Sequence, residues 1–188
     1  MGVPPGCMMR LVERESQGVA GLKGKRESAS GWPFGLTQIT PIGLAEYNRL
    51  NPAAPISEAS LMGTDAASAR IQIRGGCFLW GIGWREYSNA PNGYERAALA
   101  DLAYAKGGRA LRELIQAAAA AGYPATLNGL RSYDPTWTET EDPFGHAAFV
   151  AAGLGDPPPA VGSSPLVAIG IGVLAGLGLL LLLLGWIK

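Results

Sequence analysis

The stretch DAASARIQIRGGCFLWGIGWREY, from Asp65 to Tyr87, decides the fold class. Asp65 is a favoured residue just before the first turn of a helix, where its carboxylate accepts hydrogen bonds from backbone N–H groups. Apolar residues then recur at helical spacing along one stripe, and others form a second face. The stripe holds Ala66, Ala69, Ile73, Cys77, Trp80, Trp84 and Tyr87, and the second face holds Ile71, Phe78 and Ile82. Because a helix that is apolar on two faces is usually buried on both, we expect it to be the central helix.

The sequence on either side of this stretch also favours helices. Pro4 and Pro5 suit the first turn of a helix, and Asn92 suits the position before one. The expected helices cover about residues 4–16, 40–50, 92–106, 109–121 and 143–152. A Gly-, Ser- and Lys-rich loop fills residues 17–33, and strand signals are few. The predicted fold class is therefore all-α or nearly so.

The C-terminal part of the chain differs from the rest. Residues 166–187 carry no charge and would span roughly 33 Å as a helix, enough for the hydrocarbon core of a bilayer. Residues 156–165 contain three consecutive prolines, which favour an extended linker. The sequence thus predicts a domain over residues 1–155, a linker, a transmembrane helix and a lipid bilayer as partner. Gly172 and Gly176 form a small-xxx-small pair that could associate such helices.

Composition excludes several classes of function. Lysine and arginine balance aspartate and glutamate, so no basic patch points to a nucleic-acid partner. Cys7 and Cys77 have neither metal-ligand spacing nor the number that a disulfide framework needs. His146 is the only histidine, so a serine–histidine triad would have to include it. Phosphate-binding and zinc motifs are absent, and we expect no metal and no cofactor.

Glu15 is the residue that stands out chemically. The helix that contains it has an apolar arc made of Cys7, Met8, Leu11 and Val12. Glu15 lies close to the middle of that arc, whereas Glu13 points to the opposite side. A carboxylate in such a place is costly unless it is paired or protonated, and a protonated carboxyl group can act as a general acid. The alternative is a solvated helix end, or a pair with Arg14 or Arg131.

Four short motifs extend this observation along the chain. Glu15-Ser16 ends the first helix, and Gly35-Leu-Thr-Gln-Ile-Thr-Pro41 follows the loop. Ala103-Tyr-Ala-Lys-Gly107 comes later, and Glu139-Thr140 is followed by Phe149-Val150. In this order the motifs resemble those of the soluble lytic transglycosylase family, relatives of goose-type lysozyme. The resemblance covers about residues 10–150 and implies a lysozyme-like domain that acts on peptidoglycan glycan strands.

The resemblance also implies roles for individual residues. Glu15 would protonate the oxygen between N-acetylmuramic acid and N-acetylglucosamine, then take the proton of the muramyl 6-hydroxyl as a 1,6-anhydro ring closes. Gln38 would bind an acetamido group or hold the cleft, and Tyr104 would place its hydroxyl near Glu15. Ser16 would bond near the carboxylate or shape the helix end, and Gly35 would allow a close backbone approach at the cleft wall.

Several positions depart from the family pattern, and they leave alternatives open. Ala105 stands where the third motif has asparagine, Phe149 stands where the fourth has tyrosine, and the loop before Gly35 is longer. One alternative is a structural membrane protein that keeps the fold without activity. Another is a hydrolytic lysozyme with a second carboxylate, such as Glu27.

The expected location follows from the apolar C-terminus. The N-terminus lacks the basic and apolar segments of a secretory signal peptide, and a single-pass anchor follows the domain. A wall-cleaving enzyme of this layout suits the internal membrane of a bacteriophage particle, where it would open the wall during genome delivery. A bacterial cell envelope is the alternative location.

Overall fold

The computed structural model describes residues 2–25, 31–137 and 142–155, all of which belong to one unit over residues 1–158. In these ranges the secondary structure is helical, and the only strand-like pairing consists of two isolated bridges of Phe34, with Lys23 and with Ile39. The helices are α1 (Pro5–Ser16), α2 (Pro41–Leu50), α3 (Glu58–Met62), α4 (Ala66–Glu86), α5 (Gly93–Lys106), α6 (Gly108–Ala120), α7 (Leu127–Tyr133), α8 (Pro143–Ala151) and the 3-10 helix η1 (Ala152–Leu154). This composition agrees with the all-α part of the predicted fold class.

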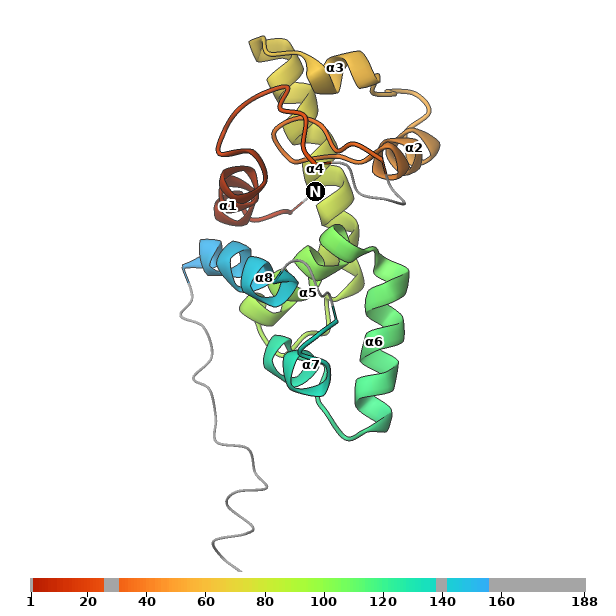
Figure 1. Ribbon diagram of the computed structural model, residues 1–188, viewed down its shortest axis with the longest axis vertical. Coiled ribbons are helices and arrows are strands. Elements are labelled where there is room, and N and C mark those ends of the chain that lie inside the picture. The colour runs from red at the N-terminus through yellow and green to blue at the C-terminus, as the bar shows by residue number, and fades with distance from the viewer. Residues whose placement is uncertain (1, 26–30, 138–141, 156–188) are drawn as a thin grey trace, which may run out of the picture. The chain divides into compact units, whose positions relative to one another are not determined.

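Helix α4 begins where its cap predicts and crosses much of the fold (Figure 1). One carboxylate oxygen of Asp65 accepts hydrogen bonds from the N–H groups of Ala67 and Ser68. Its buried face differs from the predicted stripe, because Ile73 is 38% exposed while Gln72 is fully buried. The predicted stripe was based on apolar residues alone. Gln72 is buried because its side-chain amide forms hydrogen bonds in the interior.

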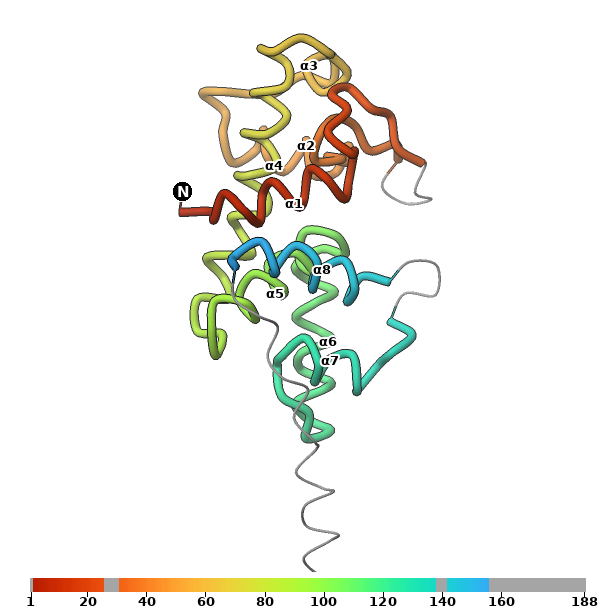
Figure 2. Tube along the Cα trace, turned by 90° about the vertical axis from the view of Figure 1, so that its left-hand side faces the viewer, coloured from red at the N-terminus to blue at the C-terminus, as the bar shows by residue number. Residues whose placement is uncertain are grey.

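Two hydrophobic clusters lie along α4. The smaller cluster lies beside α2 and α3 and consists of Phe34, Ile39, Tyr47, Ile56 and Leu61. The larger cluster gathers side chains from α1, α4, α5, α6, α7 and α8, with α5 the most deeply buried helix. Figure 2 shows α1 running beside α8, and these two helices are in contact. The most enclosed helix is therefore α5, rather than the stretch 65–87 that the sequence singled out.

One close approach fixes how α4 and α5 cross. A Cβ atom added at Gly83 would lie 2.9 Å from the Cα atom of Ala100 and 3.0 Å from its carbonyl oxygen. No side chain fits there, so the backbones approach each other directly. Trp80, one turn earlier on α4, is fully buried in the larger cluster.

The predicted fold class and location need a correction at the membrane. No helix within residues 2–25, 31–137 and 142–155 is both long enough and apolar enough to cross a bilayer. The longest described helix, α4, carries Arg70, Arg74, Arg85 and Glu86, charges that a lipid environment disfavours. This finding contradicts the predicted transmembrane helix and the single-pass membrane location. The run 166–187 on which they rested, its linker 156–165 and the pair Gly172 and Gly176 lie outside the described residues.

Candidate active site

Glu15 occupies the last turn of α1, on the side that faces the domain. Its side chain is 22% exposed, whereas Glu13 is exposed to solvent as predicted. The helix ends because Gln17 adopts a left-handed conformation, with φ of 53°, and its N–H bonds to the carbonyl of Glu13. The closest charged partner of the Glu15 carboxylate is neither Arg14 nor Arg131. It is His146 on α8, whose Nε2 atom lies 3.2 Å from Glu15 Oε1.

His146 connects Glu15 to a second, deeper carboxylate. Its Nδ1 atom lies 2.5 Å from Oδ2 of Asp101 on α5, a side chain with no exposed surface. The other oxygen of Asp101 accepts a hydrogen bond of 3.3 Å from the indole N–H of Trp80. The Nε2 atom of His146 is buried and is not aligned for a hydrogen bond, so its contact with Glu15 is an electrostatic one.

The two carboxylates control the charge of this imidazole. Burial by itself lowers the pKa of His146, because a buried cation loses its hydration. The bond to Asp101 and the contact with Glu15 outweigh burial and raise the pKa to about 9. At neutral pH the ring is therefore an imidazolium between two carboxylates.

The motif loop from Gly35 to Gln38 lies against the end of α1. Ser16 is buried, and its hydroxyl donates to the carbonyls of Val12, at 3.0 Å, and Leu36, at 2.8 Å. Gly35 has a φ of +79°, and a Cβ atom there would lie 2.9 Å from the Gln72 side chain. The Gln38 amide donates to the carbonyls of Leu22 and Gly35. Ser16, Gly35 and Gln38 thus fix the loop next to the catalytic candidate.

Tyr104 joins this loop to α5. Its hydroxyl donates a hydrogen bond of 2.5 Å to the carbonyl oxygen of Thr37. Burial, followed by the charge of Glu15, raises the pKa of the Tyr104 phenol, so the phenol keeps its proton. The structure therefore brings the five predicted site residues together, because Gly35 and Gln38 belong to one short loop. Glu15, Ser16 and Tyr104 lie around that loop.

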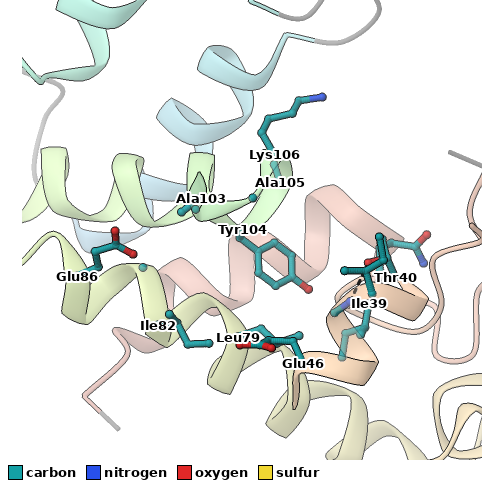
Figure 3. A pocket seen from close by; sticks show the side chains of 16 residues that line it. Ile39, Thr40, Glu46, Leu79, Ile82, Glu86, Ala103, Tyr104, Ala105 and Lys106 are labelled. Atoms are coloured by element: carbon teal, nitrogen blue, oxygen red, sulfur yellow. Dashed lines mark hydrogen bonds between the residues drawn. The ribbon is translucent and has the colours of Figure 1, made fainter. Parts of the chain in front are cut away.

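A cleft of about 520 Å³ opens on the other side of Tyr104. Figure 3 shows the Tyr104 ring pointing from α5 toward Ile39 and Thr40. Helices α2, α4 and α5 supply most of the residues that line the cleft. The full lining is Gln38, Ile39, Thr40, Ile42, Gly43, Glu46, Leu79, Ile82, Gly83, Glu86, Ala103, Tyr104, Ala105, Lys106, Gly107 and Gly108. Ala105, which departs from the third motif, is part of this wall. Glu15 is not part of the lining.

The remaining candidates have defined places or fall outside the described chain. Phe149 lies on α8, and the Arg10 guanidinium stands 4.8 Å from its ring centre. Glu27 and the pair Glu139-Thr140 lie outside the described residues. The described part of the chain contains no group of three His, Cys, Asp or Glu side chains that could hold a metal ion.

Comparison with known proteins adds no relative. No family model, no curated protein and no solved structure matches this chain. The resemblance to the transglycosylases therefore rests on the short motifs alone.

Three residues of the site region were not found from the sequence. Asp101 is a lone acid within the apolar run ALADLAYA, the same signal that singled out Glu15, and it could have been found that way. His146 was noticed only as the sole histidine. Gln72 lies between two isoleucines on α4 and gave no signal, because its four hydrogen-bond partners belong to segments of the chain outside α4.

Proposed function

We propose that this protein is a peptidoglycan lytic transglycosylase in which Glu15 is the catalytic acid and base. The observation that carries the proposal is the position of the Glu15 carboxylate. It is mostly buried, it ends a helix against the Gly35–Gln38 loop, and it lies next to both Tyr104 and a protonated histidine. Such a partly enclosed carboxylate with a proton source beside it suits general acid catalysis.

The chemistry needs only one carboxylate at the sugar. Glu15 gives a proton to the glycosidic oxygen as the bond to C1 of the muramyl residue breaks. It then accepts the proton of the muramyl 6-hydroxyl as that oxygen bonds to C1 and closes the anhydro ring. Asp101 could not activate water at the sugar, because it is fully buried behind His146.

The cleft supports a carbohydrate ligand in size and lining. Its volume of about 520 Å³ lies within the range of small-molecule sites. Its lining combines the apolar residues Leu79 and Ile82 with the polar residue Gln38 and the aromatic residue Tyr104. Sugars present both apolar faces and hydroxyl groups, so a mixed surface of this kind suits them.

A hydrolytic lysozyme is the second candidate, and one observation favours it. Two carboxylates, Glu46 and Glu86, line the cleft and could in principle activate water. Each is already in an ion pair, Glu46 with Arg49 at 2.7 Å and Glu86 with Arg112 at 2.8 Å. These pairs hold the carboxylates away from a role as a free base, so we favour the transglycosylase.

The test is product analysis with matched variants. The purified full chain is incubated with peptidoglycan sacculi, and the released muropeptides are identified by mass spectrometry. We expect ends of 1,6-anhydro-N-acetylmuramic acid, which are lighter by one water than hydrolysed ends. Glu15→Gln should reduce release at least ~100-fold, the usual contribution of general acid–base catalysis. Glu13→Gln, on the exposed side of the same helix, should leave it unchanged.

Each other outcome contradicts part of the proposal. Predominantly reducing ends would identify a hydrolase and direct attention to Glu46. Unchanged release by Glu15→Gln would remove the catalytic assignment. No product from a folded chain on several wall types would favour the structural, inactive alternative.

A further inference from the structure

We propose that His146 and Asp101 form a relay behind Glu15, in which protonated His146 supplies the proton that Glu15 delivers. The catalytic part of this inference rests on the proposed function. The protonation state of the three side chains depends only on the fold and can be measured without any substrate. His146 acts through Glu15 and is therefore a positioning residue.

The three side chains lie in order from the surface to the interior: Glu15, His146 and Asp101. The side chain of Glu15 is 22% exposed, that of His146 is 12% exposed, and that of Asp101 is fully buried. The buried end is held by the Trp80 indole, and the short bond from Nδ1 to Asp101 orients the ring. The Nε2 atom is thereby turned toward Glu15, the only member of the set that could reach a bound sugar.

The carboxylates of Asp101 and Glu15 are the groups that raise the pKa of His146. Helices α1, α5 and α7 pack against α8 together with η1. The three helices carry these titratable groups: Cys7, Arg10, Glu13, Arg14, Glu15, Tyr94, Glu95, Arg96, Asp101, Tyr104, Lys106, Arg131 and Tyr133. Arg10 lies over the Phe149 ring, and Arg131 is 4.0 Å from the carboxylate of Asp142. The thiol of Cys7 has its pKa raised to about 11, by burial and then by Asp101, and stays neutral.

Glu95 and Tyr104 each have a hydrogen-bond partner other than His146. The Glu95 carboxylate accepts a bond of 2.6 Å from the N–H of Leu127. Tyr104 donates to the carbonyl of Thr37 and keeps its proton, as described above. Among the residues that the structure describes, Glu15 and Asp101 are thus the charged groups in direct contact with the imidazole.

The proposed step moves one proton and conserves it. Glu15 Oε1 lies 3.2 Å from Nε2 of His146, and a small rotation of the carboxylate aligns the two atoms for a hydrogen bond. The Nε2 proton then passes to Glu15, which leaves a neutral imidazole whose Nδ1–H stays on Asp101. Glu15 then protonates the glycosidic oxygen, which keeps the electron pair of the broken C1–O bond. The 6-hydroxyl oxygen bonds to C1, its proton returns to Glu15, and from there it returns to His146.

The relay has a consequence for the pH range of activity. An isolated carboxyl group, with an ordinary pKa of about 4.3, loses its protonated form tenfold for each pH unit above that value. The set of three side chains keeps its proton until His146 titrates, at about pH 9. The relay therefore allows acid catalysis at neutral and mildly alkaline pH.

The decisive measurement is a titration of His146 by NMR. His146 is the only histidine in the chain, so one ring C–H signal of the full chain, prepared without a histidine tag, reports on it alone. We expect a titration midpoint near pH 9 in the parent protein, and lower midpoints in Glu15→Gln and in Asp101→Asn. Glu15→Gln changes the exposed end of the relay, so it keeps the test valid if Asp101→Asn does not fold.

The pH profile of wall cleavage tests the catalytic part. We expect the parent protein to keep its cleavage rate between pH 5 and pH 8. In His146→Gln the ratio of the rate at pH 8 to that at pH 5 should fall at least ~10-fold, since an isolated carboxyl loses its protonated form over that range. A rate that is lower by the same factor at every pH would mean a merely structural role and would overturn the relay.

The two proposals fail in different ways. A His146 midpoint near 6.5 would overturn the relay, whatever the chain does to peptidoglycan. A midpoint near 9 that falls in Glu15→Gln, in a chain that releases no muropeptides, would support the coupled side chains and contradict the proposed function.

Discussion

Replacing Gln72 with methionine should destabilise this protein far more than a typical substitution on a helix. Gln72 is fully buried on α4, and its side chain bonds to four backbone groups outside that helix. Its oxygen accepts from the N–H of Gly21, at 3.3 Å, and of Leu36, at 3.0 Å. Its nitrogen donates to the carbonyls of Ser60, at 3.2 Å, and Gly63, at 2.7 Å. Methionine keeps the length of the side chain and removes all four bonds.

The magnitude follows from how well water could replace each bond. The bond to the Leu36 N–H is buried, so its loss leaves a donor without a partner, at about 1–3 kcal/mol. The other three are partly buried, and each contributes about 0.5–1 kcal/mol net. The sum is about 2.5–6 kcal/mol of unfolding free energy. Because Leu36 belongs to the motif loop, the proposed cleavage of peptidoglycan should fall as well.

The assay is urea unfolding followed by circular dichroism. Gln116→Met provides the matched control, since Gln116 is exposed on α6 and its loss should change stability by no more than about 0.5 kcal/mol. Equal midpoints for Gln72→Met and Gln116→Met would refute the view that the Gln72 amide holds the loop in place.

Two further predictions concern stability. The pKa of His146 is raised from 6.5 to about 9, so the stabilisation it provides is fully present below pH 6.5 and is lost as pH rises through about 9. The unfolding free energy should fall by about 3 kcal/mol across that window relative to His146→Gln, and parallel curves for the two proteins would contradict the raised value. Gly83→Ala should destabilise by about 1–3 kcal/mol in thermal or urea unfolding, because its Cβ would press on the backbone of Ala100. Gly81→Ala meets only side chains, the nearest 3.2 Å away, and should be tolerated; equal losses at both glycines would refute a rigid crossing.

Local signals in the sequence predicted most of the longer helices. Asp65 and Asn92 accept hydrogen bonds from the first turns of α4 and α5, as their residue types indicated. Helices α3 and α7 were not predicted. Each is short, so neither shows a repeating apolar pattern, although Ser57 and Thr126 cap them. Helix α5 is the most enclosed because small alanines let neighbouring helices approach on every side, which an apolar stripe does not reveal.

The sequence predicted only part of the site, because several of its contacts join residues that are far apart in the chain. Glu15 and the Gly35–Gln38 loop are close in sequence, so a motif could link them. The contact of Glu15 with His146, and that of His146 with Asp101, joins three helices that only the packing of the larger cluster brings together. No spacing rule connects residues that far apart. The hydrogen bond from Tyr104 to Thr37 was likewise beyond sequence reasoning, although Tyr104 itself was named.

The presence of two hydrophobic clusters has a consequence for cooperativity. The catalytic candidate Glu15 belongs to a helix of the larger cluster, whereas Phe34 and Ile39, on either side of the motif loop, belong to the smaller one. Their alignment depends on a few bonds, among them Ser16 to Leu36 and Tyr104 to Thr37. The smaller cluster has fewer buried side chains and should open locally at a lower free energy than the whole domain. If the protein cleaves peptidoglycan as proposed, mild denaturant should therefore abolish cleavage while α5 is still folded and its amide protons are still protected from exchange.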